Sequence, residues 1–187
     1  MSSKINGQFV LWLMGPTSSG KTTLANNLLS ILRKKGLQTL HYDGDEVRGF
    51  FGSNLGFEPS DRLRIVKTLV HLSNKSLEAG VNVVVSALTA NDDARNYVRD
   101  NTINLKTIYI QCSIKHCAQR DPKGLYTKAN NGEIQTLIGL NTEYKEPESP
   151  DFVVNTEGKS IETSVKEIVT QLGDVGLIYD KKIAAKK

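Results

Sequence analysis

Two short stretches of this 187-residue chain hold most of the side chains whose types and spacing could do chemistry. The first, GPTSSGKTT at residues 15–23, satisfies the pattern G-x-x-x-x-G-K-[ST] and directly follows the apolar run FVLWLM. Such glycines let consecutive backbone amides point inward, and a helix that begins behind them adds partial positive charge, so the stretch predicts a nest for a polyphosphate. The residues expected to contact phosphate in this loop are Gly15, Ser18, Ser19, Gly20, Lys21, Thr22 and Thr23.

Two side chains of this phosphate-binding loop, or P-loop, have distinct predicted roles. Lys21 is expected to reach the β- and γ-phosphates of a nucleoside triphosphate, and the Thr22 hydroxyl to help hold Mg²⁺. The other interpretation, a glycine-rich turn with an incidental lysine, is disfavoured because a strand pattern precedes the loop and a helix pattern follows it.

The second stretch, HYDGDEVR at residues 41–48, places Asp43 and Asp45 on either side of Gly44. At a strand exit beside a P-loop, such carboxylates can orient or deprotonate an acceptor hydroxyl, or anchor Mg²⁺ through water, and we expect Gly44 to allow a tight turn that aims both into a cleft. Arg48 supplies a fork suited to an anionic acceptor. Asp-Gly-Asp is also good turn and helix-cap chemistry, and only its place after the second strand favours the functional interpretation.

The rest of the chain supplies elements that can hold these two stretches together. Short apolar runs rich in β-branched or aromatic residues predict strands at 9–14, 37–42, 81–88, 105–112 and 151–156. Apolar residues at three- and four-residue spacing predict helices at 21–35, 61–79, 91–101, 114–119 and 160–172. The alternation predicts an α/β fold: a P-loop NTPase-type, doubly wound, parallel five-stranded sheet with helices on both faces. Ligands gather at the carboxyl ends of such strands, where both stretches lie.

Composition narrows the function classes. With 39% hydrophobic and 24% charged residues, the chain fits one globular domain over residues 1–187, with a core at about 8–172 and a C-terminal tail at 173–187. The net charge of +4 is mild and no basic stretch alternates with aromatics, so no nucleic-acid partner is expected. The run FVLWLM is too short to cross a membrane, which predicts a cytoplasmic protein without a membrane partner. Cys112 and Cys117 fit no metal or redox spacing.

Among proteins with a P-loop, a switch GTPase is disfavoured. The D-x-x-G pattern occurs at Asp121–Gly124, after a helix rather than at a strand exit, and Asn74-Lys75 is followed by Leu77 where a base-reading motif needs aspartate. Phosphoryl transfer to an acceptor therefore remains the favoured chemistry.

Several further motifs, in order, carry a family resemblance. GPTSSGKTT, DGDEVR, LGFEPSDR, ARNYVRD, RDPKGLYTKANNGEI and IGLNTEYKEPESPD together resemble the adenylylsulfate kinase family over residues 8–172. The resemblance implies ATP-dependent phosphorylation of the 3′-hydroxyl of adenylyl sulfate, with Mg²⁺ as cofactor, usually by a homodimer.

The resemblance also implies roles for individual residues. It implies that Asp45, Asp43 and Lys21 are the catalytic residues. It also implies that Thr22 binds Mg²⁺ and that Asp45 contacts the ion through water. The family's mobile lid falls on residues 120–126, with Arg120 by the ATP base and Lys123 on the phosphates. The implied acceptor-binding residues are Arg48, Phe57, Arg62, Lys67, Ser86 and Leu137.

The departures from the family pattern all lie on the acceptor side. After DR the family has an asparagine and a pair of arginines, whereas this chain has residues 65–68, IVKT, with Lys67 as the one cation. Where the family has a second aromatic residue and a lysine before it, this chain has Leu137 and Gln135, and the usual I-S-P is replaced at residues 88–90 by LTA. Three hypotheses stay open: an adenylylsulfate kinase with a divergent pocket, a related kinase acting on cytidine diphosphoramidate, and a nucleotide-binding regulatory protein without catalysis.

Overall fold

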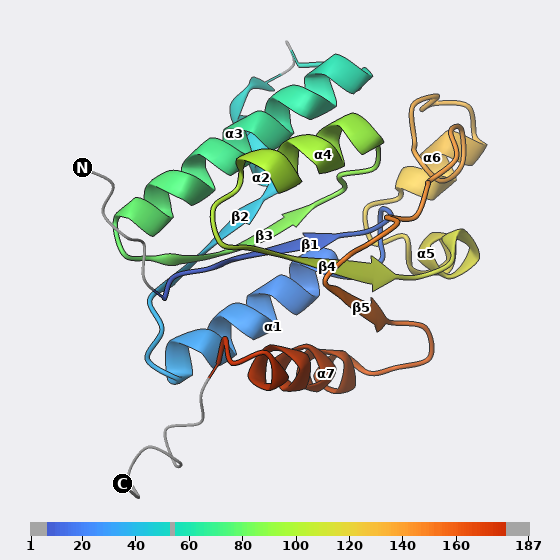
Figure 1. The fold of residues 1–187 in the computed structure, drawn as a ribbon. Coiled ribbons are helices and arrows are strands. Elements are labelled where there is room, and N and C mark those ends of the chain that lie inside the picture. Colours follow the sequence, from blue (N-terminus) through green and yellow to red (C-terminus); the bar gives the residue numbers. More distant parts are fainter. Residues whose placement is uncertain (1–6, 53–54, 179–187) are drawn as a thin grey trace, which may run out of the picture.

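The computed structural model describes residues 7–52 and 55–178, and its centre is a parallel five-stranded sheet (Figure 1). The strand order is β2-β3-β1-β4-β5, and every pairing is parallel. This confirms the predicted fold class. The strands are β1 (Val10–Met14), β2 (Thr39–Asp43), β3 (Asn82–Ala87), β4 (Leu105–Gln111) and β5 (Phe152–Asn155).

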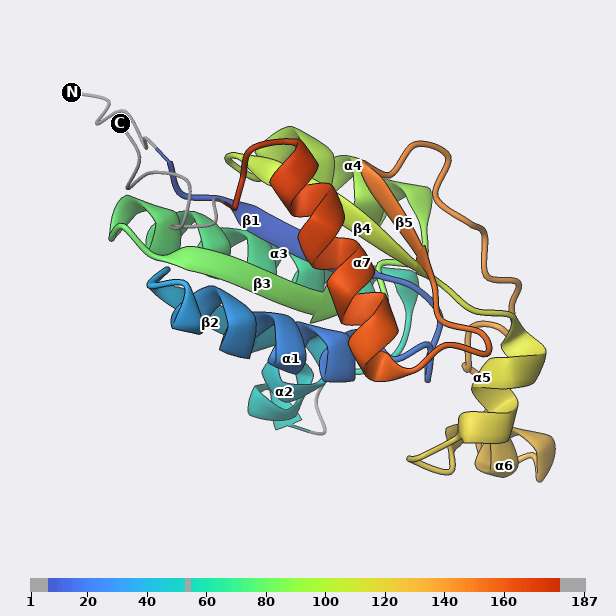
Figure 2. The ribbon, with the colours of Figure 1, turned by 90° about the horizontal axis from the view of Figure 1, so that it is seen from below.

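Helices cover both faces of the sheet. In Figure 1, α1 and α7 lie below it, whereas α3 and α4 lie above it. Figure 2 shows α5 and α6 projecting beyond one end of the sheet. The helices are α1 (Lys21–Lys34), α2 (Gly44–Phe50), α3 (Pro59–Glu78), α4 (Asp92–Asn101), α5 (Ile114–Arg120), α6 (Leu125–Asn130) and α7 (Ile161–Asp174).

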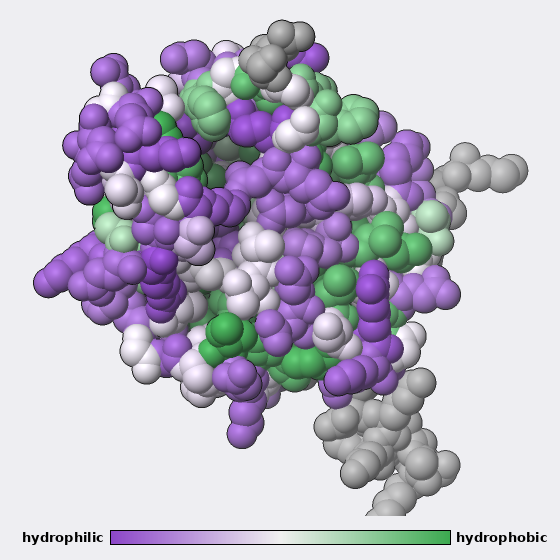
Figure 3. Space-filling view, turned by 180° about the vertical axis from the view of Figure 1, so that it is seen from behind, coloured by the Kyte–Doolittle hydropathy of each residue, from purple (hydrophilic) through white to green (hydrophobic). Residues whose placement is uncertain are grey.

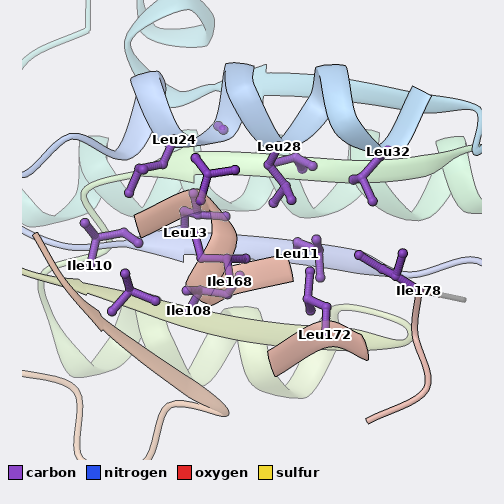
Figure 4. Packing of buried hydrophobic residues seen from close by; sticks show 14 of the residues in the cluster. Leu11, Leu13, Leu24, Leu28, Leu32, Ile108, Ile110, Ile168, Leu172 and Ile178 are labelled. Carbon is purple, nitrogen blue, oxygen red and sulfur yellow. The ribbon is translucent and has the colours of Figure 1, made fainter. Parts of the chain in front are cut away.

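The central strand shows why the predicted strands are apolar almost without a break. All five side chains of β1 are buried, and they alternate between the two faces of the sheet. Leu11 and Leu13 join the core under α1 and α7, whereas Trp12 joins the core under α3 and α4. Figure 4 shows the first of these cores, in which the leucines of α1 meet β1, β4 and α7: Leu11, Leu13, Leu24, Leu28, Leu32, Ile108, Ile110, Ile168, Leu172 and Ile178.

The structure extends the packed part of the chain past the predicted boundary at residue 172. Helix α7 runs to Asp174, and Ile178 is buried in the core beside α1 and α7. The Gly176 backbone turns the chain back, so the apolar pair Leu177 and Ile178 reaches the sheet layer. The remainder of the predicted tail, residues 179–187, lies outside the described residues.

The surface turned away in Figure 1 is largely hydrophilic, with hydrophobic side chains in separate patches (Figure 3). No helix within residues 7–52 and 55–178 is long and apolar enough to cross a bilayer.

Candidate active site

A cleft of about 650 Å³ opens where β1, β2 and β3 end. Its lining combines the P-loop, the end of β2 with the helix α2 that follows it, the exit of β3 and the segment that carries α5 and α6. Because all strands are parallel, their carboxyl ends meet at this edge, as predicted.

The P-loop backbone is shaped for close contacts. A Cβ on Gly15 would lie 2.5 Å from the Ile110 carbonyl oxygen, and Gly20 has a φ of 100° at the start of α1. Ser18 has a φ of 63°, a left-handed conformation that a non-glycine residue adopts at a cost, and such strain clusters at binding loops. The Ser19 side chain is fully buried beneath the loop, so among the predicted phosphate contacts it can contribute only through its backbone.

Lys21 folds back into the loop. Its Nζ donates a hydrogen bond of 2.6 Å to the Pro16 carbonyl oxygen. Burial lowers the pKa of Lys21 to about 8, although the charges of Asp45 and Asp43 act in the opposite direction. The ammonium therefore lies poorly solvated beside two carboxylates, where a phosphate group would favour its charged form.

Asp43 ends β2 and forms the floor of the cleft. Its Oδ2 accepts hydrogen bonds of 2.7 Å from the hydroxyls of both Thr22 and Ser86, and its Oδ1 accepts one of 2.8 Å from the Asp45 backbone amide. Burial alone would raise the pKa of Asp43, but these hydrogen bonds hold it below its usual value. The last of them also caps α2, so the helix-cap interpretation and the functional one both apply to Asp43.

Asp45 has a different environment. Its side chain is 71% exposed and its Oδ2 lies 2.5 Å from the Lys123 Nζ, across the cleft. Both carboxylates line the cleft, as expected, but the Asp43 oxygens are engaged by Thr22 and Ser86, whereas the Asp45 carboxylate is the more exposed of the two. The expected tight turn at Gly44 is wrong: Gly44 opens α2, and its Cβ would lie 3.2 Å from Ala87 Cβ, so close packing is what favours glycine there.

The predicted lid is anchored to the P-loop at two points. Arg120 donates a hydrogen bond of 3.4 Å to the Ser19 carbonyl oxygen of the P-loop, and a second one of 2.6 Å to the Thr156 carbonyl oxygen after β5. The buried Tyr126 donates one of 3.1 Å to the Thr17 carbonyl oxygen of the P-loop. Between these anchors, the Asp121 carboxylate accepts bonds from the backbone amides of Tyr126 and Thr127 at the start of α6. Lys123 stands on the loop so formed.

The other end of the cleft is built around Phe57. The Arg48 and Arg62 guanidiniums lie 4.7 and 5.8 Å from its ring centroid. Arg48 also donates to the Gly56 carbonyl oxygen, and Arg62 donates 2.8 and 2.9 Å hydrogen bonds to the carbonyl oxygens of Phe57 and Thr136. Phe57 is 52% exposed and lines the cleft, so part of its ring surface is accessible to a ligand.

The altered register after DR gives this end of the cleft an apolar wall. Ile65 and Val66 line it together with Leu88, Ala90 and Leu137. Lys67 is exposed and does not line it, because its Nζ lies 5.2 Å from the Tyr97 ring centroid on the flank of α3. The prediction that Lys67 contacts the acceptor is therefore wrong, because the structure does not bring Lys67 to the cleft.

The remaining predicted residues divide into two groups. Ser86 lies 2% exposed at the β3 exit, and its hydroxyl bonds Asp43 rather than pointing freely into the cleft. The others line the cleft, and their contacts with ATP or the acceptor stay predictions: Ser18, Gly20, Lys21, Thr22, Thr23, Asp45, Arg48, Phe57, Arg62, Arg120, Lys123 and Leu137.

Sequence reasoning missed residues that hold the cleft walls. Thr156 receives Arg120 and also donates a 3.1 Å hydrogen bond to the Ser19 carbonyl oxygen, and its place just after β5 was the available signal. Thr89 has a φ of 43°, its hydroxyl accepts a 2.9 Å bond from Trp12 Nε1, and its carbonyl accepts a 3.0 Å bond from Arg95 Nε. No sequence pattern marks that turn, because its partners come from β1 and α4.

Fold and site together define a P-loop nucleotide-binding protein of the kinase kind: a polyphosphate nest, a carboxylate on the P-loop threonine and a second, exposed carboxylate in one cleft. The sequence model described as adenylylsulphate kinase matches residues 7–155. The chain belongs to the adenylylsulfate kinase family and is an ATP-dependent kinase with a hydroxyl acceptor.

Individual relatives agree. The chain is 38% identical over 167 residues to the adenylyl-sulfate kinase of Oceanobacillus iheyensis, covering 88% of this chain and 84% of that one. It is 39% identical over 149 residues to a probable adenylyl-sulfate kinase of Archaeoglobus fulgidus, covering 80% and 96%. Among solved structures, the Mycobacterium tuberculosis APS kinase in complex with AMPPNP and APS is similar with a TM-score of 0.81 at 29% identity, covering 89% of this chain and 98% of that chain.

Proposed function

We propose that the protein transfers the γ-phosphate of ATP to the 3′-hydroxyl of adenylyl sulfate, giving 3′-phosphoadenylyl sulfate and ADP. The observation that carries this is the pairing, in one cleft, of the exposed Asp45 carboxylate with an aromatic ring flanked by Arg48 and Arg62. A stacking ring beside two fixed cations suits a nucleotide that carries a second anionic group. The relatives' names and the APS bound to the similar solved structure support the same acceptor.

The residues then divide the chemistry. Lys21 and the P-loop amides hold the β- and γ-phosphates, and Arg120 stands at the base end of ATP. The oxygen of the acceptor hydroxyl bonds to the γ-phosphorus, and Asp45 takes the proton that this hydroxyl loses. At the same time the bond between the γ-phosphorus and the bridging oxygen of ADP breaks, so that ADP leaves. Lys123 is bound to Asp45 in this structure, and a γ-phosphate in the cleft would compete for it, which frees the carboxylate as the lid closes.

The residues present fit Mg²⁺. Because the Thr22 hydroxyl donates its proton to Asp43, its lone pairs are available to a cation, and Asp45 adds an exposed carboxylate nearby. No cluster of three or more acidic, histidine or cysteine side chains that could hold a metal occurs in the described part of the chain. This agrees with an ion held by one hydroxyl, water and substrate phosphates, which neutralises phosphate charge when bound.

A second acceptor, cytidine diphosphoramidate, stays a candidate because of the apolar wall. Phe57 is the one aromatic side chain among the described residues that line the cleft, and Leu137 stands where the family has another. A smaller pyrimidine base needs less aromatic stacking than adenine, so this wall would suit it.

The direct test is product identification. The protein is incubated with ATP, Mg²⁺ and adenylyl sulfate, and the product is analysed by mass spectrometry and by phosphorus NMR, which locates the new phosphate. A 3′-phosphate is the expected result. ATP binding without ADP formation on any acceptor would instead favour a regulatory protein without catalysis.

Two further parts of the proposal concern assembly and location. A homodimer is proposed from the family resemblance, and light scattering that gives the mass of one chain would contradict it. A cytoplasmic location is proposed on the same basis, and cell fractionation tests it.

A further inference from the structure

His41 is a partly buried polar side chain next to the site, and the mechanism above does not use it. It precedes Asp43 by two residues on β2, so both side chains face the same side of the sheet. Strand register pairs Asp43 with Ser86 on β3, which brings the Ser86 hydroxyl to both of them. His41 Nε2 lies 2.9 Å from Ser86 Oγ, and Ser86 Oγ lies 2.7 Å from Asp43 Oδ2.

Donor and acceptor chemistry fixes the proton positions in this series of hydrogen bonds. A carboxylate only accepts, so the single hydroxyl proton of Ser86 is committed to Asp43. The proton between Ser86 and His41 must then come from His41, which fixes the imidazole with a hydrogen on Nε2. On the other side of Asp43, the series of hydrogen bonds ends at Thr22, whose hydroxyl donates to the same Oδ2.

We infer that His41 is a positioning residue for the Thr22 hydroxyl, acting through Ser86 and Asp43. The inference rests on the proposed function as an ATP-dependent kinase. His41 does not line the cleft, whereas Thr22 does. By donating to Ser86, His41 holds that hydroxyl on Asp43, and the oriented carboxylate keeps the Thr22 proton away from the phosphate site. The Thr22 lone pairs are thereby presented to the cation that accompanies the nucleotide.

The matched pair of variants is His41→Leu and His41→Gln. Leucine fills a similar space but has no donor. The glutamine Nε2 is separated from Cβ by the same number of bonds as the histidine Nε2, so it can donate to Ser86 at the same place. A packing role would be disturbed by both changes, whereas a positioning role is restored by glutamine alone.

The experiment measures binding of a non-hydrolysable β,γ-imido analogue of ATP by calorimetry, with Mg²⁺ and then with EDTA. It involves no acceptor, so it is independent of whether adenylyl sulfate is the substrate. For His41→Leu we expect the tightening that Mg²⁺ produces to shrink about tenfold, while affinity in EDTA stays within about twofold of wild type. His41→Gln is expected to keep the wild-type tightening. His71→Leu, at an exposed position on α3, controls for the substitution itself.

A double-mutant cycle tests the route through Ser86. Ser86→Ala should lose Mg²⁺-dependent tightening as His41→Leu does, and adding His41→Leu to Ser86→Ala should cost nothing further. Thermal melting of each variant checks folding, and Ser86→Ala keeps the test available if His41→Leu does not fold. Wild-type tightening in His41→Leu, equal losses in the leucine and glutamine variants, or additive losses in the double variant would each overturn the inference.

Discussion

The Nζ of Lys123 and the Oδ2 of Asp45 lie 2.5 Å apart, joining the predicted lid to the first turn of α2. Both side chains are more than half exposed, so this ion pair should contribute little to stability. Its significance is that the Lys123 ammonium, on the predicted lid, lies directly on the Asp45 carboxylate proposed as base. A phosphate arriving there would exchange one partner of Lys123 for another.

Replacement of Lys123 tests that relationship. For Lys123→Met we expect the melting temperature to stay near wild type, and kcat/KM for ATP to fall about tenfold or more, because one phosphate contact is lost on closure. Lys159→Met is the matched control. Lys159 Nζ lies 2.8 Å from Glu167 Oε2, and neither residue lines the cleft. Equal losses of activity in the two variants would contradict a specific role for Lys123.

The two aspartates should respond differently to the same substitution. Asp45→Asn should leave ATP-analogue affinity within about twofold of wild type and lower kcat by about a hundredfold or more, since the acceptor loses its base. Rapid-mix and steady-state assays with a fixed acceptor measure this. Unchanged turnover would remove Asp45 from the mechanism.

For Asp43→Asn we expect a loss of nucleotide affinity that is larger with Mg²⁺ than with EDTA. The amide oxygen can still accept, but the charge that holds the Thr22 and Ser86 hydroxyls is gone. Asparagine remains a good helix cap, so α2 should survive and melting should change little. A loss that is the same with and without Mg²⁺ would contradict the assignment of Asp43 to the Thr22 hydroxyl.

Lys21 predicts a pH dependence of ATP binding. Burial lowers its pKa to about 8, so free protein loses this charge as pH rises through 8, and affinity for an ATP analogue should fall by up to about tenfold per pH unit above it. Lys21→Arg stays charged and should show a flat binding profile. A flat wild-type binding profile would contradict the assignment.

The same group should affect stability in the opposite direction. The pKa of Lys21 is about 8 in the folded protein and 10.5 in the unfolded chain, so the unfolded chain holds the proton more tightly. Between pH 8 and 10.5 this group therefore makes the fold more stable as pH rises.

Phe57 predicts a selective effect on the acceptor. Phe57→Ala should raise KM for adenylyl sulfate by about fivefold to a hundredfold, with KM for ATP unchanged, since base stacking is worth on the order of 1 to 3 kcal/mol. Phe50→Ala is the control, because Phe50 is 89% exposed and does not line the cleft. A comparable rise in the control variant would show that the effect is not one of stacking.

The sheet could be predicted because every strand carries its own signal. Strands buried on both faces are apolar almost throughout, and the P-loop motif sits where the first of them ends. Helices α2 and α6 were not predicted, since α2 spans seven residues and α6 spans six, too few to show a helical period.

The site was harder to predict wherever it depends on contacts between strands. Asp43 and Asp45 could be singled out from their spacing, but which of them is buried depends on Thr22 and Ser86 lying next to Asp43. Lys67 was assigned to the cleft by resemblance, yet its position on α3 turns it to Tyr97. His41 gave no signal at all, because only the β2–β3 register brings it to Ser86.

The central claim concerns the acceptor, and one ratio tests it most directly: kcat/KM for adenylyl sulfate divided by kcat/KM for cytidine diphosphoramidate, measured by ADP release under saturating ATP and Mg²⁺. The arginine-flanked ring and the family membership predict a ratio of at least about tenfold in favour of adenylyl sulfate. A ratio below one, or ADP release with neither acceptor, would contradict it.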